Sequence, residues 1–140
     1  MLNKLWAFIF LIAPMLLHAT PDVSVDILRF KTGTISFIEA SLYIVGSSLT
    51  CKPGIYSEYG VEYVIVLKDA NQNIVGGNRY RLSSSGCPSK DLMDSRRFEL
   101  PPGDYSLEIE MTDFVDTLNT VMIQQAFTIE KADNNLLLSD

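Results

Sequence analysis

The stretch LPPGDYSLEIEMT, residues 100–112, decides the fold. Its first half is a turn by composition, because proline presets φ and glycine accepts a positive φ. In its second half apolar and polar side chains alternate from Tyr105 to Thr112. A period of two places the apolar side chains on one face of a pleated strand. The stretch therefore predicts a turn that leads into a half-buried β-strand.

The same period of two extends outward from this strand in both directions, and no window has a helical stripe. Gly76-Gly77 indicates a bulge or a bend in one of the strands, and residues 83–94 are expected to form a polar loop. The predicted strands are residues 23–30, 35–45, 61–68, 74–82, 96–100, 105–112 and 121–129. About seven short strands separated by turns are typical of an all-β domain, and we expect a single antiparallel immunoglobulin-like β-sandwich.

The N-terminus has the pattern of an export signal. Lys4 precedes an uncharged apolar stretch, LWAFIFLIAPMLL, at residues 5–17. This stretch is shorter than the roughly 20 residues that a membrane-spanning helix needs, and it has the length of a signal-peptide core. We expect a signal helix with cleavage after Ala19, which gives a signal peptide at residues 1–19 and a β-sandwich domain at residues 20–140. An uncleaved membrane anchor is the alternative. The predicted location is exported, whether periplasmic, outer-envelope or secreted.

Removal of this leader changes the chemistry that the protein can perform. The single His and the single Trp of the chain, His18 and Trp6, both lie in it. Without imidazole, nucleophile activation by His and metal sites that use His are excluded. We therefore predict no enzyme activity, no catalytic, cofactor-binding or metal-binding residues, and no cofactor.

The charge of the chain indicates which partners it lacks. The formal net charge is −6 at pH 7. Nucleic-acid binding requires a clustered basic face, and binding to anionic lipid requires a polybasic stretch. Neither occurs here, so we expect no nucleic-acid partner and no membrane contact after signal cleavage.

Cys51 and Cys87 lie in turn-rich segments. An even number of cysteines in an exported protein predicts a structural disulfide. Two free thiols in different loops are the alternative. The spacing excludes a redox CxxC motif and a zinc knuckle.

Acidic loop residues leave minor alternatives open. Residues 69–73 (DANQN) imitate the start of a calcium loop, but Ile74 and Tyr80 occupy the positions of the required Gly and Glu. A hairpin turn explains the segment better. Asp113 and Asp116 could belong to a calcium site between loops, or to a hydrolase that uses only carboxylates. Solvated turn caps are the preferred interpretation.

One aromatic cluster is a candidate contact surface. Tyr56, Tyr59 and Tyr63 could form an exposed patch that binds a ligand or a protein. Packing of these side chains over the end of the sandwich is the preferred interpretation. The sheet edges are the other candidate surface.

Two motifs carry a resemblance to a known family. Residues 39–49 (EASLYIVGSSL) and residues 100–113 (LPPGDYSLEIEMTD) resemble the N-terminal β-rich region of the exported bacterial envelope proteins named for a GWxTD motif. The similarity spans nearly the whole chain after the leader. It implies a β-sandwich in the cell envelope, and it implies no particular reaction. The naming motif does not occur in this sequence, so the resemblance implies a chain truncated after Asp140.

These observations predict a non-enzymatic exported β-sandwich module for protein–protein interaction or structural spacing in the bacterial cell envelope. Its partner is expected to be an envelope protein that the sequence does not identify. The alternatives are a ligand-binding module, or a small secreted protease inhibitor with residues 86–94 as its reactive loop.

Overall fold

The protein is described here by a computed structural model that covers residues 20–55 and 57–131. This part of the chain folds into seven β-strands and a single 3-10 turn, η1, at Gly46–Ser48. The strands are β1 Val23–Thr32, β2 Ile35–Ile44, β3 Glu58–Asp69, β4 Ile74–Ser85, β5 Leu92–Glu99, β6 Gly103–Asp113 and β7 Thr120–Ile129. The predicted signal peptide at residues 1–19 lies outside the described residues, as do residues 132–140.

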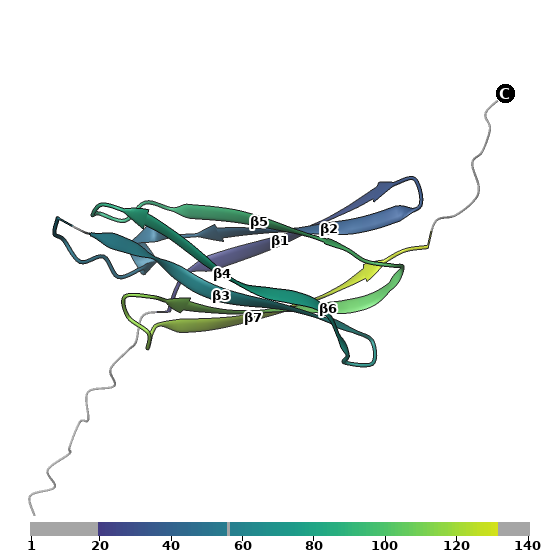
Figure 1. Cartoon of the computed structure of the whole chain (residues 1–140). Helices are drawn as coiled ribbons and strands as arrows, with labels where there is room; N and C mark the ends of the chain where they lie inside the picture. Colours follow the sequence, from purple (N-terminus) through teal and green to yellow (C-terminus); the bar gives the residue numbers. More distant parts are fainter. Residues whose placement is uncertain (1–19, 56, 132–140) are drawn as a thin grey trace, which may run out of the picture.

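The strands form two antiparallel sheets that face each other (Figure 1). One sheet has the order β1-β2-β5 and the other the order β4-β3-β6-β7. The predicted all-β sandwich is thereby confirmed. In a constant-type immunoglobulin domain the fourth strand belongs to the sheet of the first two, whereas here β4 pairs with β3.

The core lies between the two sheets and follows the predicted period of two. On β6, Tyr105, Leu107, Ile109 and Met111 are buried while the residues between them face outward. The inner faces of β2 and β3 contribute most of the other fully buried side chains: Ile38, Ala40, Leu42, Ile44, Val61, Tyr63, Ile65 and Leu67. Burial of this apolar surface is the main favourable term in folding.

The turn before β6 holds the sandwich closed at one corner. The hydroxyl of Tyr105 donates a hydrogen bond of 2.7 Å to the carbonyl oxygen of Pro101. Immunoglobulin-like sandwiches use this tyrosine corner at the start of the equivalent strand, where the chain crosses between sheets. The stretch that predicted the fold from sequence therefore also provides a specific contact that fixes it.

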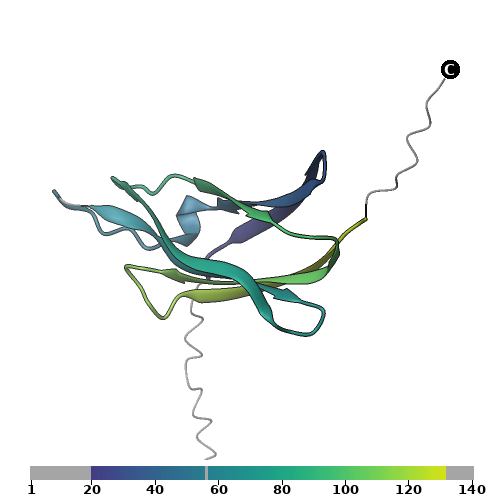
Figure 2. The same ribbon diagram turned by 45° about the vertical axis from the view of Figure 1, so that its right-hand side comes forward.

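An odd number of antiparallel strands separates the two ends of the domain. The start of β1 and the end of β7, at Val23 and Ile129, are at opposite ends of the sandwich, as the strands show in Figures 1 and 2. The turn between β1 and β2 lies at the same end of the sandwich as the end of β7 (Figure 1). The chain thus enters the domain at one end and leaves it at the other.

The segment between β4 and β5 differs from the prediction. Residues 83–94 were expected to be a loop, but β4 continues to Ser85 and β5 begins at Leu92. A loop is confirmed at residues 86–91, but its predicted bounds are wrong, because β5 points Asp94 and Arg96 toward the other sheet and its inner face does not read as apolar. The bulge or bend expected at Gly76-Gly77 is a bulge one residue earlier, since the β3–β4 register shifts between Leu67 and Lys68 and leaves Val75 without a partner residue.

A disulfide joins Cys51, in the segment before β3, to Cys87, in the segment before β5. The Cα atoms of the two cysteines are 6.0 Å apart. The predicted pairing is confirmed, and the bond ties together the two segments that follow β2 and β4. Within residues 20–55 and 57–131, no helix has the length and apolar character needed to span a membrane.

Candidate functional site

The aromatic cluster predicted as a contact surface does not form one. Tyr59 and Tyr63 are each only 1% exposed, and Tyr56 lies outside the described residues. β3 begins at Glu58, earlier than predicted, and its period of two turns both tyrosines toward the other sheet. The hydroxyl of Tyr59 accepts a 2.7 Å hydrogen bond from the backbone N–H of Lys90. Tyr59 therefore packs beneath the segment before β5, in line with the preferred interpretation of packing over the end of the sandwich.

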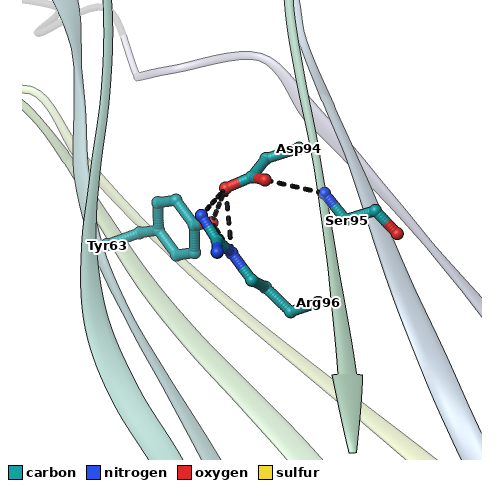
Figure 3. A network of polar contacts seen from close by, with 4 residues as sticks. All are labelled: Tyr63, Asp94, Ser95 and Arg96. Atoms are coloured by element: carbon teal, nitrogen blue, oxygen red, sulfur yellow. Dashed lines mark hydrogen bonds and ion pairs between the residues drawn. The ribbon is translucent and has the colours of Figure 1, made fainter.

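Tyr63 belongs to a polar network with Asp94 and Arg96 on β5 (Figure 3). Its hydroxyl donates a short hydrogen bond to Oδ2 of Asp94. The guanidinium of Arg96 donates to the same carboxylate oxygen, at 2.5 Å from Nη2, and its Nε donates to the Tyr63 hydroxyl at 3.1 Å. The other carboxylate oxygen accepts the backbone N–H of Ser95 at 2.8 Å. The arginine also stacks on the ring of Tyr80, 3.9 Å from its centroid.

This network closes the side of the sandwich between the edge strands β4 and β5. Burial and the hydrogen bond to Asp94 raise the pKa of Tyr63 well above its usual range, so the phenol stays neutral and acts as a donor. The network members satisfy one another in the closed sandwich. Sequence reasoning missed the network because the strand predicted at residues 96–100 begins after Asp94, which was placed in the preceding loop. The available signal was a period of two from Leu92 through Phe98 with polar side chains at two inner positions.

Asp113 is a buried loop anchor with every carboxylate oxygen in use. It is 0% exposed. Its Oδ1 accepts the backbone N–H groups of Val115 and Asp116, at 2.8 and 3.2 Å. Its Oδ2 accepts the N–H of Thr50 at 2.6 Å and the side-chain amide of Asn119 at 3.4 Å. These bonds fix the turn before β7, and they leave the carboxylate without a free position for a metal or for hydrolytic chemistry.

The acidic segment at residues 69–73 is the predicted hairpin turn. Oδ1 of Asp69 accepts the backbone N–H groups of Asn71 and Asn73, at 2.8 and 2.9 Å. The N–H of Asn73 contributes most to lowering the pKa of Asp69. Among the residues that the structure describes, no three potential metal ligands come together.

The segment considered as an inhibitory loop is held against the end of β2. The Ser89 hydroxyl donates to the carbonyl of Gly46 at 2.5 Å, and Oδ1 of Asp91 accepts the N–H of Gly46 at 2.9 Å. The Tyr43 hydroxyl donates to the other oxygen of Asp91. The last residues of the segment already belong to β5. The segment is therefore fixed at several points along its length.

A shallow hollow of about 270 Å³ lies on the outer face of the four-stranded sheet. Its lining combines apolar and charged side chains, among them Val64, Val66, Arg79, Glu110 and Met122. Charges of both signs line it, so it does not define the chemistry of one ligand.

The sheet edges differ in how they are protected against pairing with another strand. The edges are β1 and β5 in one sheet, and β4 and β7 in the other. Natural edge strands carry charged residues, bulges or inward-pointing charges that prevent such pairing. β1 contains Asp26, Arg29 and Lys31, β5 points its charged pair inward, and β4 combines Arg79 with the bulge.

β7 has none of these protections. Its sequence, TVMIQQAFTI, makes it the one strand without a charged residue among the seven in the described part of the chain. It also contains no proline and no glycine. Its pairing with β6 runs from Thr120 to Ile129 without a register shift. β7 is therefore a regular, uncharged edge strand, and we define its free edge as the candidate functional site.

β7 is anchored on one face and accessible on the other. Phe127 and Ile129 point into the core and are 5% and 7% exposed. Met122, on the outer face, is 69% exposed, and Gln124 and Ala126 on the same face are also exposed. In an antiparallel edge strand, alternate residues direct their N–H and C=O groups away from the sheet. Within the described part of the chain, β7 thus presents a row of backbone donors and acceptors that pair with no other strand.

The fold and this edge define the class of the protein as an immunoglobulin-like β-sandwich with one unshielded edge strand. No protein-family model matches the chain, and no curated protein matches it.

The solved structures that match the chain are distant in sequence. One is a Bordetella pertussis protein provisionally assigned as ApaA, with 8% identity and a TM-score of 0.44 over 80% of this chain and 95% of that one. Another is a structural-genomics target designated SoR45, with 12% identity and a TM-score of 0.46 over 89% and 95%. A third is a protein from Archaeoglobus fulgidus, with 12% identity and a TM-score of 0.39 over 81% and 100%.

Proposed function

We propose that the protein is a non-enzymatic, exported β-sandwich module of the bacterial cell envelope that binds a β-strand of another polypeptide along the free edge of β7. The observation that carries this proposal is that β7, unlike every other described strand, contains no charged residue. Strand addition to a sheet edge is a common mode of protein recognition, in which main-chain hydrogen bonds supply affinity.

The arrangement of the domain supports a role in contact and spacing. The start of β1 and the end of β7 lie at opposite ends of the sandwich (Figure 1), so the domain can separate whatever is attached before it and after it. β7 is the last of the described strands, and it forms one edge of the four-stranded sheet.

Export is supported by the leader pattern at residues 5–17 and by the Cys51–Cys87 disulfide. Disulfides persist in oxidising compartments outside the cytosol. Sequencing of the N-terminus of the purified protein should begin at Thr20, and a protein that retains Met1 would contradict the cleavage.

Strand addition can be tested by photo-crosslinking in the native cells. A photo-reactive residue is placed at Gln124, on the free edge strand, and in a matched control at Ser24, on the charged edge strand β1. Both positions are exposed. We expect a crosslinked product from Gln124 and none from Ser24. Equal products at both positions, or none at Gln124, would refute the proposed binding edge.

A further inference from the structure

We infer that the strand received at this edge is β7 of a second copy of the same chain, joined in antiparallel register about a two-fold axis that passes through Gln124. This inference rests on the proposed function and identifies the partner of the same site. It would join two four-stranded sheets into one continuous sheet of two β4-β3-β6-β7 units. Most soluble oligomers are closed and symmetric, and a two-fold interface uses the same patch on both subunits.

Charge is the first argument for a second copy as the partner. The chain is acidic overall, with a formal net charge of −6. Two copies that meet through an edge strand whose charges have one sign, such as β4 with Arg79 and Arg81, would place like charges opposite one another, which is unfavourable. β7 is the strand through which they can meet without this cost, because it contains no charged residue.

The order of side chains along β7 is the second argument. The pairing of Met122 with Glu110 and of Gln124 with Glu108 places the even-numbered residues of β7 on the outer face of the sheet. A two-fold axis at Gln124, perpendicular to the sheet, keeps this face common to both copies. It sets the two Gln124 residues opposite each other and sets Met122 opposite Ala126. The most exposed apolar side chain of the strand thus meets the other apolar side chain of the same face.

Association is tested first with a charge. The protein is expressed from its full sequence, purified, and its mass in solution is measured by sedimentation over a range of concentrations. Q124K places two positive charges opposite each other across the axis, while the control S24K adds the same charge to the edge of the other sheet. We expect a dimer whose Kd rises roughly tenfold or more in Q124K, equivalent to about 1.4 kcal/mol, and does not change in S24K.

The register is tested with cysteines. Residues opposite each other on antiparallel strands have Cβ atoms about 4.5–5.5 Å apart, close to the range of a disulfide. Under oxidation Q124C should therefore form covalent dimers. A126C has the same outward orientation but lies about four residues from its symmetry mate, roughly 13 Å along the strand, and should not. A mixture of M122C and A126C should crosslink between the two variants.

The outcomes separate this inference from the proposed function. Dimers that persist in Q124K, or that crosslink through A126C alone, would overturn the inferred interface. A monomer at all soluble concentrations, combined with a different protein photo-crosslinked at Gln124, would overturn the second copy as the partner and leave strand addition in place. A dimer that formed only after removal of residues 132–140 would mean that the chain's own C-terminal segment occupies the edge in the full chain, and would overturn both this inference and the proposed function. A monomer with no crosslinked product at Gln124 would refute both.

Discussion

The network of Tyr63, Asp94 and Arg96, which closes the side of the sandwich between β4 and β5, gives a prediction whose magnitude follows from its contacts. Y63F removes one hydroxyl that donates to Asp94 and accepts from Arg96, and it leaves the ring in place. Hydrogen bonds to charged groups contribute about 1.5–3 kcal/mol. Asp94 and Arg96 retain their 2.5 Å contact with each other in the variant, so we expect a loss near the lower end, about 2 kcal/mol in the free energy of unfolding. For a domain of this length that corresponds to roughly 8 °C in Tm.

The assay is urea and thermal unfolding of the variant and the wild type. Because the pKa of Tyr63 is raised by burial, its phenol is neutral below the ordinary tyrosine pKa, and the loss should be constant between about pH 6 and 9. Y43F is the matched control, since Tyr43 makes the same type of bond to Asp91 but is 39% exposed. Water can replace that bond, so Y43F should lower Tm less. A loss below about 0.5 kcal/mol in Y63F, or a larger effect in Y43F, would refute the reasoning.

Three further predictions concern the corner, the disulfide and acid pH. Y105F should lower the free energy of unfolding by about 1 kcal/mol in urea titrations, because it removes the 2.7 Å corner bond of Tyr105; an unchanged midpoint would contradict the role of the corner. Replacement of both Cys51 and Cys87 by serine should cost about 4 kcal/mol, since the disulfide closes a loop with a sequence separation of 36, and wild-type protein kept in reductant should match the variant. The Tyr43 hydroxyl lowers the pKa of Asp91. The ionised Asp91 carboxylate therefore contributes its full stabilisation above the ordinary carboxyl pKa of about 4, and this stabilisation is lost as the pH falls below that value. The Tm of D91N should accordingly fall less steeply than the Tm of the wild type as the pH is lowered from about 5 to 3. Parallel curves of Tm against pH would be evidence against this linkage.

The strands with apolar inner faces could be predicted from sequence, whereas only the second half of β5 could. On β6 the alternation of Tyr105, Leu107, Ile109 and Met111 with polar residues places the strand and its buried face directly. On β5 two of the four inner positions are Asp94 and Arg96. Their burial is tolerable only because Tyr63, on a strand of the other sheet, completes their hydrogen bonds. The alternation of apolar and polar residues along β5 does not show that Tyr63 of another strand will pair with Asp94 and Arg96.

The disulfide could be predicted and the candidate site could not. Two cysteines in turn-rich segments are sufficient to predict a pair, and the structure joins Cys51 to Cys87. The uncharged sequence of β7 is visible in the chain, but whether a strand lies at an edge depends on sheet order. β7 follows β6 and pairs with it alone, whereas β3, which also reads as strongly apolar, is covered by neighbours on both sides.

The opposite positions of the start of β1 and the end of β7 (Figure 1) determine how the domain would respond to mechanical load. Tension applied through the two ends of the chain acts nearly parallel to the strands. β1 would have to slide along β2, and β7 along β6, and each of these strand pairs contains ten residue pairs. Such loading is in shear, because the backbone hydrogen bonds of a whole strand pair resist together and do not open one after another. If the first strands nevertheless yielded, the Cys51–Cys87 bond would keep the segment between the two cysteines from extending.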